Sequence, residues 1–328
     1  MSDGTGIEWT DATWNPLVGC TKISPGCENC YAEGVVNRFV GTSAAFPARF
    51  DTVTLRGQRF LSQPLRWRKP RRVFVNSLSD LFYKDVPDEF IARVFAVMAL
   101  APQHTFQLLT KRHGRMRALL SSEVFQGQVQ EAAQGVVAAY APVTVWDWSW
   151  PLSNVWLGVS VEDQKRADLR IPALLGTPAA IRWISAEPLL GPIDLTRLPF
   201  SAWTGMSTGQ SAAVVDAVGG RYGVPGMWQT KATGLDWVIC GGESGPGARP
   251  MHQDWARLLR DQCESASVPY LFKQWGDWRP LADDQCAVVG DKWPTGTWGV
   301  MSRRVGKKVA GRELDGRLHD GYPQQVSA

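Results

Sequence analysis

Histidine and cysteine are scarce in this sequence, which has four histidines and six cysteines in 328 residues. Cysteines this sparse do not make a disulfide framework, and they suit a reducing cytosol. Long apolar runs are lacking as well, so no segment is expected to cross a membrane, and the start MSDGTGIEW is not expected to act as a signal peptide. We therefore expect a cytoplasmic protein. The net charge of +4 is too small to indicate a nucleic-acid partner by itself.

Three of the cysteines, Cys20, Cys27 and Cys30, lie within eleven residues, and a Pro-Gly pair predicts a turn between the first two. A structural zinc ion would normally need a fourth Cys or His, and none is near in sequence. Thiolates are the usual ligands of a 4Fe–4S cluster, and a cluster held by three of them leaves one iron free for a substrate or cofactor. We expect such a cluster. The alternatives are a zinc site completed from afar and cysteines without a ligand.

Short apolar strands alternate with helical segments along the chain. Helical periodicity is clearest over residues 88–100, 164–175 and 254–265. The predicted strands are 17–19, 72–76, 105–110, 155–160, 181–185, 236–240 and 270–274. Nearly continuous apolar strands between helices indicate a parallel sheet covered by helices. We expect an α/β fold, namely a complete or partial (β/α) TIM-type barrel of six to seven βα units.

The predicted barrel is a single domain over residues 1–328. Residues 196–233 are expected to form an insertion between the fifth and sixth strands, and residues 276–328 a C-terminal extension.

Polar or charged residues follow five of the predicted strands, and in a barrel these positions share the face where active sites are assembled. A carboxylate in such a position can instead cap the next helix, which is the alternative for Asp80 and Asp163. Glu187 is less easily explained in this way, because Pro188 fixes the turn that follows it. A glycine-rich turn after the sixth strand lets backbone amides approach a ligand. The candidate site residues are Asn76, Ser77, Asp80, Lys111, Ser160, Glu162, Glu187, Gly241, Gly242, Glu243 and Arg249.

The order of motifs resembles the three-Cys-motif proteins of phages and bacteria, a family of unknown function. The matching segments are WNP (14–16), the cysteine loop ending in CYA (30–32), NSLSDLF (76–82), LTKR (109–112), SVED (160–163), SAEPLLG (185–191) and GGESGPGARP (241–250). The same order is more distantly similar to radical SAM enzymes of the spore photoproduct lyase type. Those enzymes usually have three residues between the first two cysteines, where this chain has six.

The resemblance implies a radical SAM enzyme, in which a 4Fe–4S cluster cleaves S-adenosylmethionine to a 5′-deoxyadenosyl radical that abstracts hydrogen from the substrate. It implies iron binding by the three cysteines and an electron donor that the sequence does not identify. Carried over to this chain, it places Ser160 and Glu162 at the ribose hydroxyls and Asn76, Ser77 and Asp80 at the methionyl amino group. Lys111 or Arg249 would pair with the carboxylate. Gly241 and Gly242 would approach the cofactor, and the expected catalytic residues are Glu187, Lys111 and Glu243.

Sixteen tryptophans and two basic runs bear on the substrate. Tryptophans in loops can stack on bases while Arg and Lys bind phosphates, which would suit a nucleic acid or nucleotide. The stacking candidates are Trp146, Trp148 and Trp275, and the phosphate candidates are Arg66, Arg68, Arg71, Arg303, Lys307 and Lys308. Trp156, Trp183 and Trp237 lie inside strands and are expected in the core. The alternatives to an enzyme are a nucleic-acid-binding protein that carries a cluster or zinc, and a partner-binding barrel.

Overall fold

Seven parallel strands form the central sheet of the structure, a computed structural model that describes residues 5–40, 42, 46–140, 148–199, 213–224, 227–230, 233–281 and 302–324. The strands are β1 (Ala12–Trp14), β4 (Arg72–Val75), β5 (Thr105–Thr110), β6 (Val155–Ser160), β7 (Ile181–Ala186), β12 (Trp237–Gly241) and β13 (Tyr270–Gln274). They pair in this order, and every neighbouring pair is parallel.

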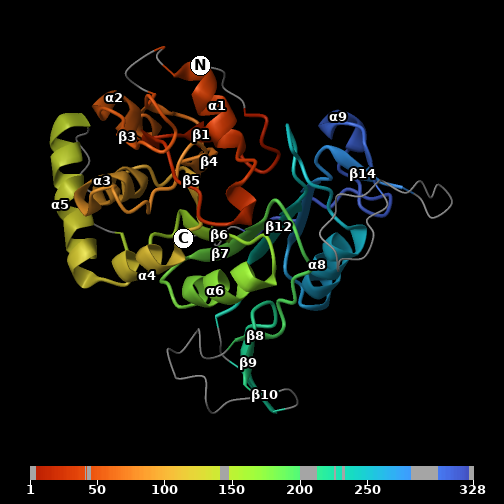
Figure 1. The fold of residues 1–328 in the computed structure, drawn as a ribbon. Helices are drawn as coiled ribbons and strands as arrows, with labels where there is room; N and C mark the ends of the chain where they lie inside the picture. The colour runs from red at the N-terminus through yellow and green to blue at the C-terminus, as the bar shows by residue number, and fades with distance from the viewer. Residues whose placement is uncertain are drawn as a thin grey trace.

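The sheet curls into a half-barrel (Figure 1), which confirms the predicted α/β class. A closed TIM-type barrel is not confirmed, because β1 and β13 are the two edges of the sheet in the described part of the chain.

Helices cover the outer face of the sheet (Figure 1), as the alternating pattern predicted. The predicted helices are present as α3 (Asp88–Ala99), α6 (Gln164–Leu175) and α8 (Gln253–Ser265). The others in the described residues are α1 (Tyr31–Phe39), α2 (Gln58–Leu61), α4 (His113–Leu120), α5 (Glu123–Tyr140) and α9 (Lys307–Ala310). None of the described helices combines the length and the apolar character needed to cross a membrane.

The first strand of the sheet is not the predicted one. Residues Leu17–Val18 form β2, which pairs antiparallel with β3 (Thr54–Leu55) in a separate ribbon. The first parallel strand is β1, which is only three residues long and precedes an Asn-Pro pair. Because so short a strand has no recognisable apolar run, the pattern favoured the neighbouring apolar residues instead. The cysteine loop nevertheless follows the first strand, as expected.

Two smaller sheets lie in the segments predicted as an insertion and an extension. Between β7 and β12, the strands β8 (Leu198–Pro199), β9 (Val214–Asp216), β10 (Arg221–Val224) and β11 (Met227–Thr230) form an antiparallel sheet that extends away from the half-barrel (Figure 1). After β13, β14 (Trp278–Pro280) pairs antiparallel with β15 (Ser302–Arg304), and α9 follows.

Tryptophans fill the inside of the curled sheet. Trp156, Trp183 and Trp237 are buried, which confirms their predicted place in the core. Trp9, from the segment before β1, packs among them, with its ring centroid 5.3 Å from that of Trp183 and 6.3 Å from that of Trp237. Aromatic pairs at such distances and with tilted planes are favourable beyond the area they bury. This aromatic cluster closes the inside of the half-barrel below the strand ends.

Candidate functional site at the carboxyl ends of the strands

A cavity of about 650 Å³ lies at the carboxyl ends of the parallel strands. Residues from the ends of all seven strands line it, together with the three cysteines of the loop. Its volume is in the range of small-molecule sites. The predicted site residues that line the cavity are Asn76, Ser77, Asp80, Lys111, Ser160, Glu187, Gly242 and Glu243, in addition to Cys20, Cys27 and Cys30. Glu162, Gly241 and Arg249 are not part of the lining.

The polar lining follows from the two-residue period of the strands. Trp183 and Leu271 belong to the aromatic cluster on the inside of the sheet. Ser185 and Lys273 come two residues later on the same strands, so they face the same side, and both line the cavity. The inside of the half-barrel therefore changes from aromatic to polar at the strand ends.

Asn76 is the lining residue with the most unusual environment. Its side chain is buried, and neither Nδ2 nor Oδ1 has a hydrogen-bond partner. Its φ of 62° is in the left-handed region, which Asn tolerates better than most residues, while its backbone N–H donates to the Trp14 carbonyl at 2.8 Å. Buried amides without partners are rare and costly. The side chain is thus free to donate to and accept from a molecule in the cavity.

Glu187 lies on the wall of the cavity in an ion pair. Its Oε1 is 3.1 Å from Nζ of Lys273, and its Oε2 accepts from the Ser185 hydroxyl at 3.2 Å. Lys273 was not among the predicted residues. A lysine on the inward side of an otherwise apolar strand could have indicated that it belongs to the site. A Cβ on Gly241 would come within 2.5 Å of Glu187 Oε1, so the Glu187 side chain would have to shift. A Cβ on Gly242 would come within 1.9 Å of the Trp275 carbonyl oxygen. The contact with the Trp275 backbone explains Gly242 without a ligand.

Asp80 organises the loops that follow β4 and β5. Its carboxylate accepts from the Thr110 hydroxyl at 2.7 Å, from the backbone N–H of Lys111 at 3.0 Å and from that of Phe82 at 3.0 Å. It also forms an ion pair with Arg112 at 3.2 Å, and both side chains are largely buried. Because these contacts engage both oxygens, the structure favours a structural role for Asp80 over the predicted contact with an amino group. Asp163, for which the same alternative was open, does cap α6 by accepting from the Arg166 N–H.

The cysteine loop lies against the cavity with its sulfurs partly covered. All three cysteines are free thiols of intermediate exposure. Burial raises the pKa of the Cys20 thiol to about 12, and the nearby Asp80 carboxylate adds to the shift. Among the described residues, no group of three His, Cys, Asp or Glu side chains is close enough to hold a metal ion.

Residues that follow three different strands hold this loop in place. After β5, Arg112 donates to Cys20 Sγ at 3.4 Å. After β6, Glu162 accepts from the Gly26 N–H at 3.3 Å. After β12, Glu243 accepts from the Asn29 side chain at 3.0 Å. The cysteine loop is thus attached to the strand ends by contacts that link positions more than ninety residues apart.

Glu162 and Arg249, both predicted to bind the cofactor, have their charges engaged within the protein. The carboxylate of Glu162 is 2.9 Å from the Arg170 guanidinium, and both side chains are buried. Arg249 donates to Glu243 at 2.7 and 2.8 Å, to Glu28 at 2.8 Å and to the Pro25 carbonyl at 2.9 Å. The structure therefore favours positioning of the cysteine loop by both residues.

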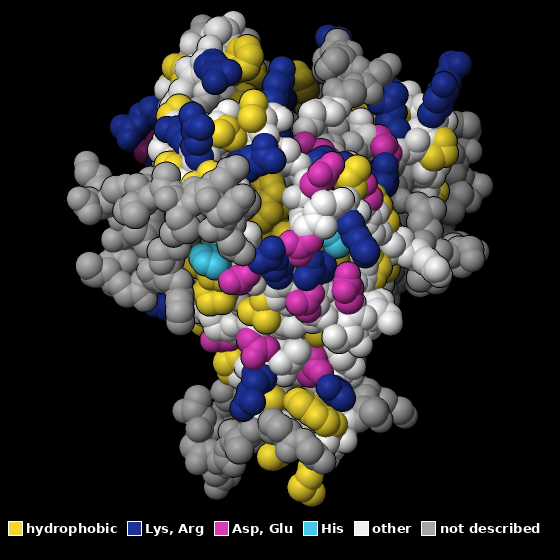
Figure 2. All heavy atoms as spheres, turned by 90° about the vertical axis from the view of Figure 1, so that its right-hand side faces the viewer, with side chains coloured by type: hydrophobic (Ala, Val, Ile, Leu, Met, Phe, Trp, Pro, Cys, Tyr) yellow, Lys and Arg dark blue, Asp and Glu magenta, His cyan; other side chains and the backbone are white. Residues whose placement is uncertain are grey.

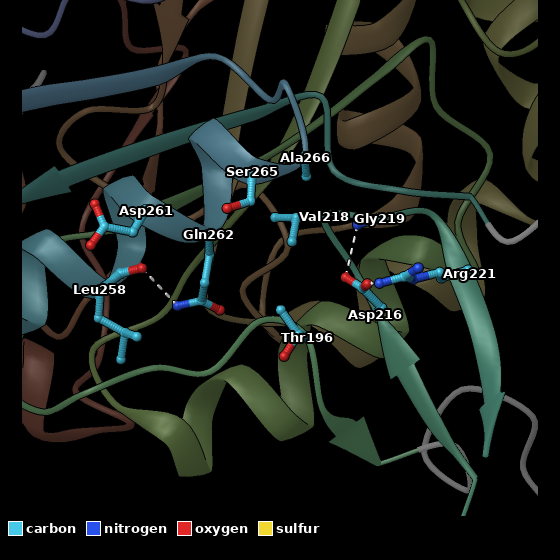
Figure 3. A pocket seen from close by; sticks show the side chains of 10 residues that line it. All are labelled: Thr196, Asp216, Val218, Gly219, Arg221, Leu258, Asp261, Gln262, Ser265 and Ala266. Carbon is cyan, nitrogen blue, oxygen red and sulfur yellow. Dashed lines mark hydrogen bonds and ion pairs between the residues drawn. The ribbon is translucent and has the colours of Figure 1, made fainter. Parts of the chain in front are cut away.

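A second cavity, of about 490 Å³, lies between α8 and the inserted sheet (Figure 3). Its polar side chains are engaged by the protein. Asp216 accepts from the Gly219 N–H and from Arg221 Nε, both at 2.8 Å. The Gln262 side chain accepts from the Leu195 N–H at 2.6 Å and donates to the Ile193 carbonyl at 3.0 Å. The contacts of Asp216 lie within the insertion, and those of Gln262 join α8 to the segment that precedes the insertion. We assign no ligand to this cavity.

The two predicted stacking residues that the structure describes, Trp148 and Trp275, do not form a platform beside the cysteines. Trp275 is buried, packs edge-on against Phe272 and donates to the Glu313 carbonyl, so its prediction as a stacking residue was wrong. Trp148 is half-buried and packs against the main core. Trp146 lies outside the described residues.

The six predicted phosphate-binding residues do not share one face. Arg66, Arg68 and Arg71 precede β4, so they lie at the amino end of the sheet, opposite the cavity. Lys307 lines the cavity and is 3.4 Å from Glu8, and Lys308 follows it on α9. Arg303 is exposed on β15.

Acidic residues accompany many of the basic ones on the C-terminal side of the molecule. Arg257 and Arg260 on α8 both pair with Asp315. Figure 2 faces the side that carries α8 and α9, and Lys, Arg, Asp and Glu side chains lie next to one another across its middle. Paired charges of this kind attract phosphates less than a uniform basic stripe would.

Comparison with known protein families gives one match, which spans residues 4–323 and is described as "Protein of unknown function (DUF5131)". The chain belongs to the DUF5131 family. This agrees with the expected family of unknown function that covers most of the chain, while the match carries no information on the cysteine motif or on radical SAM enzymes. No curated protein and no solved structure matches this DUF5131 chain.

Proposed function

We propose that this DUF5131 protein is an iron–sulfur enzyme of the radical SAM type. The observation that carries the proposal is the shared cavity: three free cysteines, a buried Asn76 amide without partners, and Lys111 line one space at the carboxyl ends of the strands. Thiolates suit iron–sulfur chemistry, and the polar groups opposite them suit an amino-acid moiety.

The donor set fits a cluster better than a single ion. A structural zinc ion would normally need a fourth Cys or His beside the three cysteines, and the described lining of the cavity contains neither. A 4Fe–4S cluster would instead be held by the thiolates of Cys20, Cys27 and Cys30, with one iron left for a cofactor. When bound, such a cluster would pass one electron from a reductant to S-adenosylmethionine, which then splits into methionine and a 5′-deoxyadenosyl radical.

The protein's own residues would bind and orient the cofactor. The Asn76 amide can donate to a carboxylate and accept from an ammonium group, so it suits the methionyl end. Ser77 and Ser160 add hydroxyl groups to the same lining. Glu187, held by Lys273 and Ser185, would present a fixed carboxylate to the substrate. The aromatic cluster below them would exclude water from the reacting groups.

Lys111, and not Arg249, is the expected partner of the cofactor carboxylate. Arg112, Lys273 and Arg249 are already in ion pairs, whereas no carboxylate of the described residues pairs with Lys111. Lys111→Met should therefore weaken S-adenosylmethionine binding roughly tenfold to a hundredfold, because a hydrogen bond to a charged group contributes about 1.5–3 kcal/mol. Calorimetric titration of the iron-loaded protein measures this effect. The exposed Lys165, replaced in the same way, serves as the control, and equal dissociation constants for the two variants would contradict the assignment.

The test of the proposed function is a product assay. Protein purified anaerobically should contain iron and sulfide, and S-adenosylmethionine with dithionite should yield 5′-deoxyadenosine and methionine in equal amounts. Zinc in place of iron, or iron without 5′-deoxyadenosine, would instead support the alternative of a nucleic-acid-binding protein without this chemistry.

We propose a nucleic acid or nucleotide as the substrate class, supported by Lys307 in the cavity lining and Lys308 beside it. Lys307→Gln/Lys308→Gln should reduce the salt dependence of oligonucleotide binding by about 0.7 to 0.9 decades per decade of salt for each phosphate that the protein no longer neutralises. Arg66→Gln/Arg68→Gln, at the other end of the sheet, is the matched control and should leave it unchanged. Fluorescence titrations across a salt series provide the measurement. Failure of the unaltered, iron-loaded protein to bind at low salt would point to another substrate class.

A further inference from the structure

We infer that Arg112 tunes the reduction potential of the proposed cluster by donating an N–H to the sulfur of its ligand Cys20. This inference rests on the proposed function. Arg112 was not among the predicted site residues, although its neighbour Lys111 was. Arg112 is a positioning and tuning residue in this scheme, since it acts through the cysteine.

The guanidinium is held in one orientation by contacts on several sides. Its Nη1 is 3.4 Å from Cys20 Sγ and 3.2 Å from an Asp80 carboxylate oxygen. Its Nη2 donates to the backbone carbonyl and to the hydroxyl of Thr21, at 3.1 Å each. Its carbon lies 4.8 Å from the centre of the Tyr83 ring. Only 12% of the side chain is exposed, so the N–H that faces the sulfur is fixed before any ligand binds.

This arrangement distinguishes Cys20 from the other two cysteines. In the described part of the chain, Cys20 is the one of the three whose sulfur accepts from a guanidinium, while Cys27 faces the Ser24 hydroxyl at 3.8 Å. A reduced cluster carries one more negative charge than an oxidised one. Hydrogen bonds to the sulfurs and a nearby cation therefore stabilise the reduced state and raise the potential. Low exposure strengthens the effect, because little water screens the charge.

The ion pair with Asp80 explains how the fold retains this cation beside the cavity. A buried guanidinium without a counter-charge would destabilise the protein, whereas Asp80 compensates it and is itself held by Thr110 and Lys111. The neighbour Arg115 offers a natural comparison. It donates to the carbonyls of Tyr83 and Val86 and pairs with Asp88, and it has no contact with a cysteine in the described residues.

The test compares the reduction potentials of iron-loaded variants by spectroelectrochemistry. Arg112→Met should shift the potential to more negative values by at least 59 mV, which corresponds to a tenfold change in a one-electron equilibrium. Arg115→Met, which also loses an ion pair, should retain the potential of the unaltered protein. A potential unchanged in Arg112→Met at full iron content would overturn the inference.

A second variant covers the case in which Arg112→Met does not bind iron. Arg112→Lys keeps the charge opposite Asp80 and loses the planar fork that reaches both the sulfur and Thr21. It should show a smaller shift in the same direction, and a potential equal to that of the unaltered protein would again overturn the inference. Failure of the unaltered protein itself to bind iron would be a failure of the proposed function, and the assay distinguishes this from a failure of the Arg112 assignment.

Discussion

Cys27→Ala should purify without the iron, sulfide and visible absorbance that the unaltered protein is expected to contain. Among the described residues, three thiols line the cavity, and Cys27 is one of them, so its loss leaves two of these ligands for the proposed cluster. Iron–sulfur clusters are held by cysteine thiolates, and the neighbouring Ser24 hydroxyl is no substitute for one. Iron and sulfide analysis after anaerobic reconstitution measures the effect.

Cys263→Ala is the matched control for this loss. Cys263 is a free cysteine buried in the core on α8, and it does not line the cavity. This variant should keep its full iron content, even if removal of a buried thiol lowers its stability. Full iron content in Cys27→Ala would exclude the three-cysteine site, and equal losses in both variants would show that the iron responds to unfolding and not to a missing ligand.

Much of the site could be predicted because parallel strands bring their carboxyl ends to one edge. Asn76, Lys111, Glu162, Glu187 and Glu243 follow five different strands and were expected in one cavity; all but Glu162 line it. Correct placement of the strands in the sequence was sufficient for this result. The strands were recognisable because each is short, apolar and bounded by polar residues.

The contacts that hold the cysteine loop could not be predicted in the same way. Glu162 pairs with Arg170, eight positions later on α6, and accepts from Gly26, which is 136 positions earlier. Local sequence patterns do not predict such pairings. The pattern of a carboxylate after a strand is the same whether the side chain faces a ligand or a buried arginine. Arg249 is a similar case, since its partner Glu28 belongs to the cysteine loop.

Among the aromatic residues, too, some positions could be predicted from the sequence and others could not. Trp156, Trp183 and Trp237 alternate with outward-facing residues inside strands, and their burial followed from that position. Trp275 directly follows β13, where a side chain can turn toward the loops or back to the core. Its contact with Phe272 and its hydrogen bond to the Glu313 carbonyl draw it inward.

Whether the barrel closes could not be predicted from the sequence either, because strands alternate with helices in the same way in open and closed sheets.

The buried pair of Glu162 and Arg170 should have the largest effect on stability. Their side chains are only 1% and 5% exposed, and Arg170 also donates to the Ser160 carbonyl at 2.7 Å. Glu162→Ala would leave the guanidinium buried without its counter-charge, which typically destabilises a protein by about 3–5 kcal/mol. It would also remove the acceptor of the Gly26 N–H in the cysteine loop. The free energy of unfolding from urea denaturation measures the first effect, and the rate of Cys27 alkylation measures the second.

Two further variants distinguish the effect of an uncompensated buried charge on stability from the effect of removing any carboxylate. Asp51→Ala breaks an exposed ion pair with Arg49, and it should lower the free energy of unfolding by less than about 1 kcal/mol, as surface pairs do. Glu162→Leu/Arg170→Met replaces the buried pair by apolar side chains, so it should recover most of the stability while the cysteine loop stays open to alkylation. The free energy of unfolding would then depend on the balance of buried charge, and the protection of Cys27 would depend on the Glu162 carboxylate. Equal stability of Glu162→Ala and Asp51→Ala would contradict this prediction, because Arg170 would then have another counter-charge. The Glu162 carboxylate would in that case be free for the ribose contact that the resemblance implies.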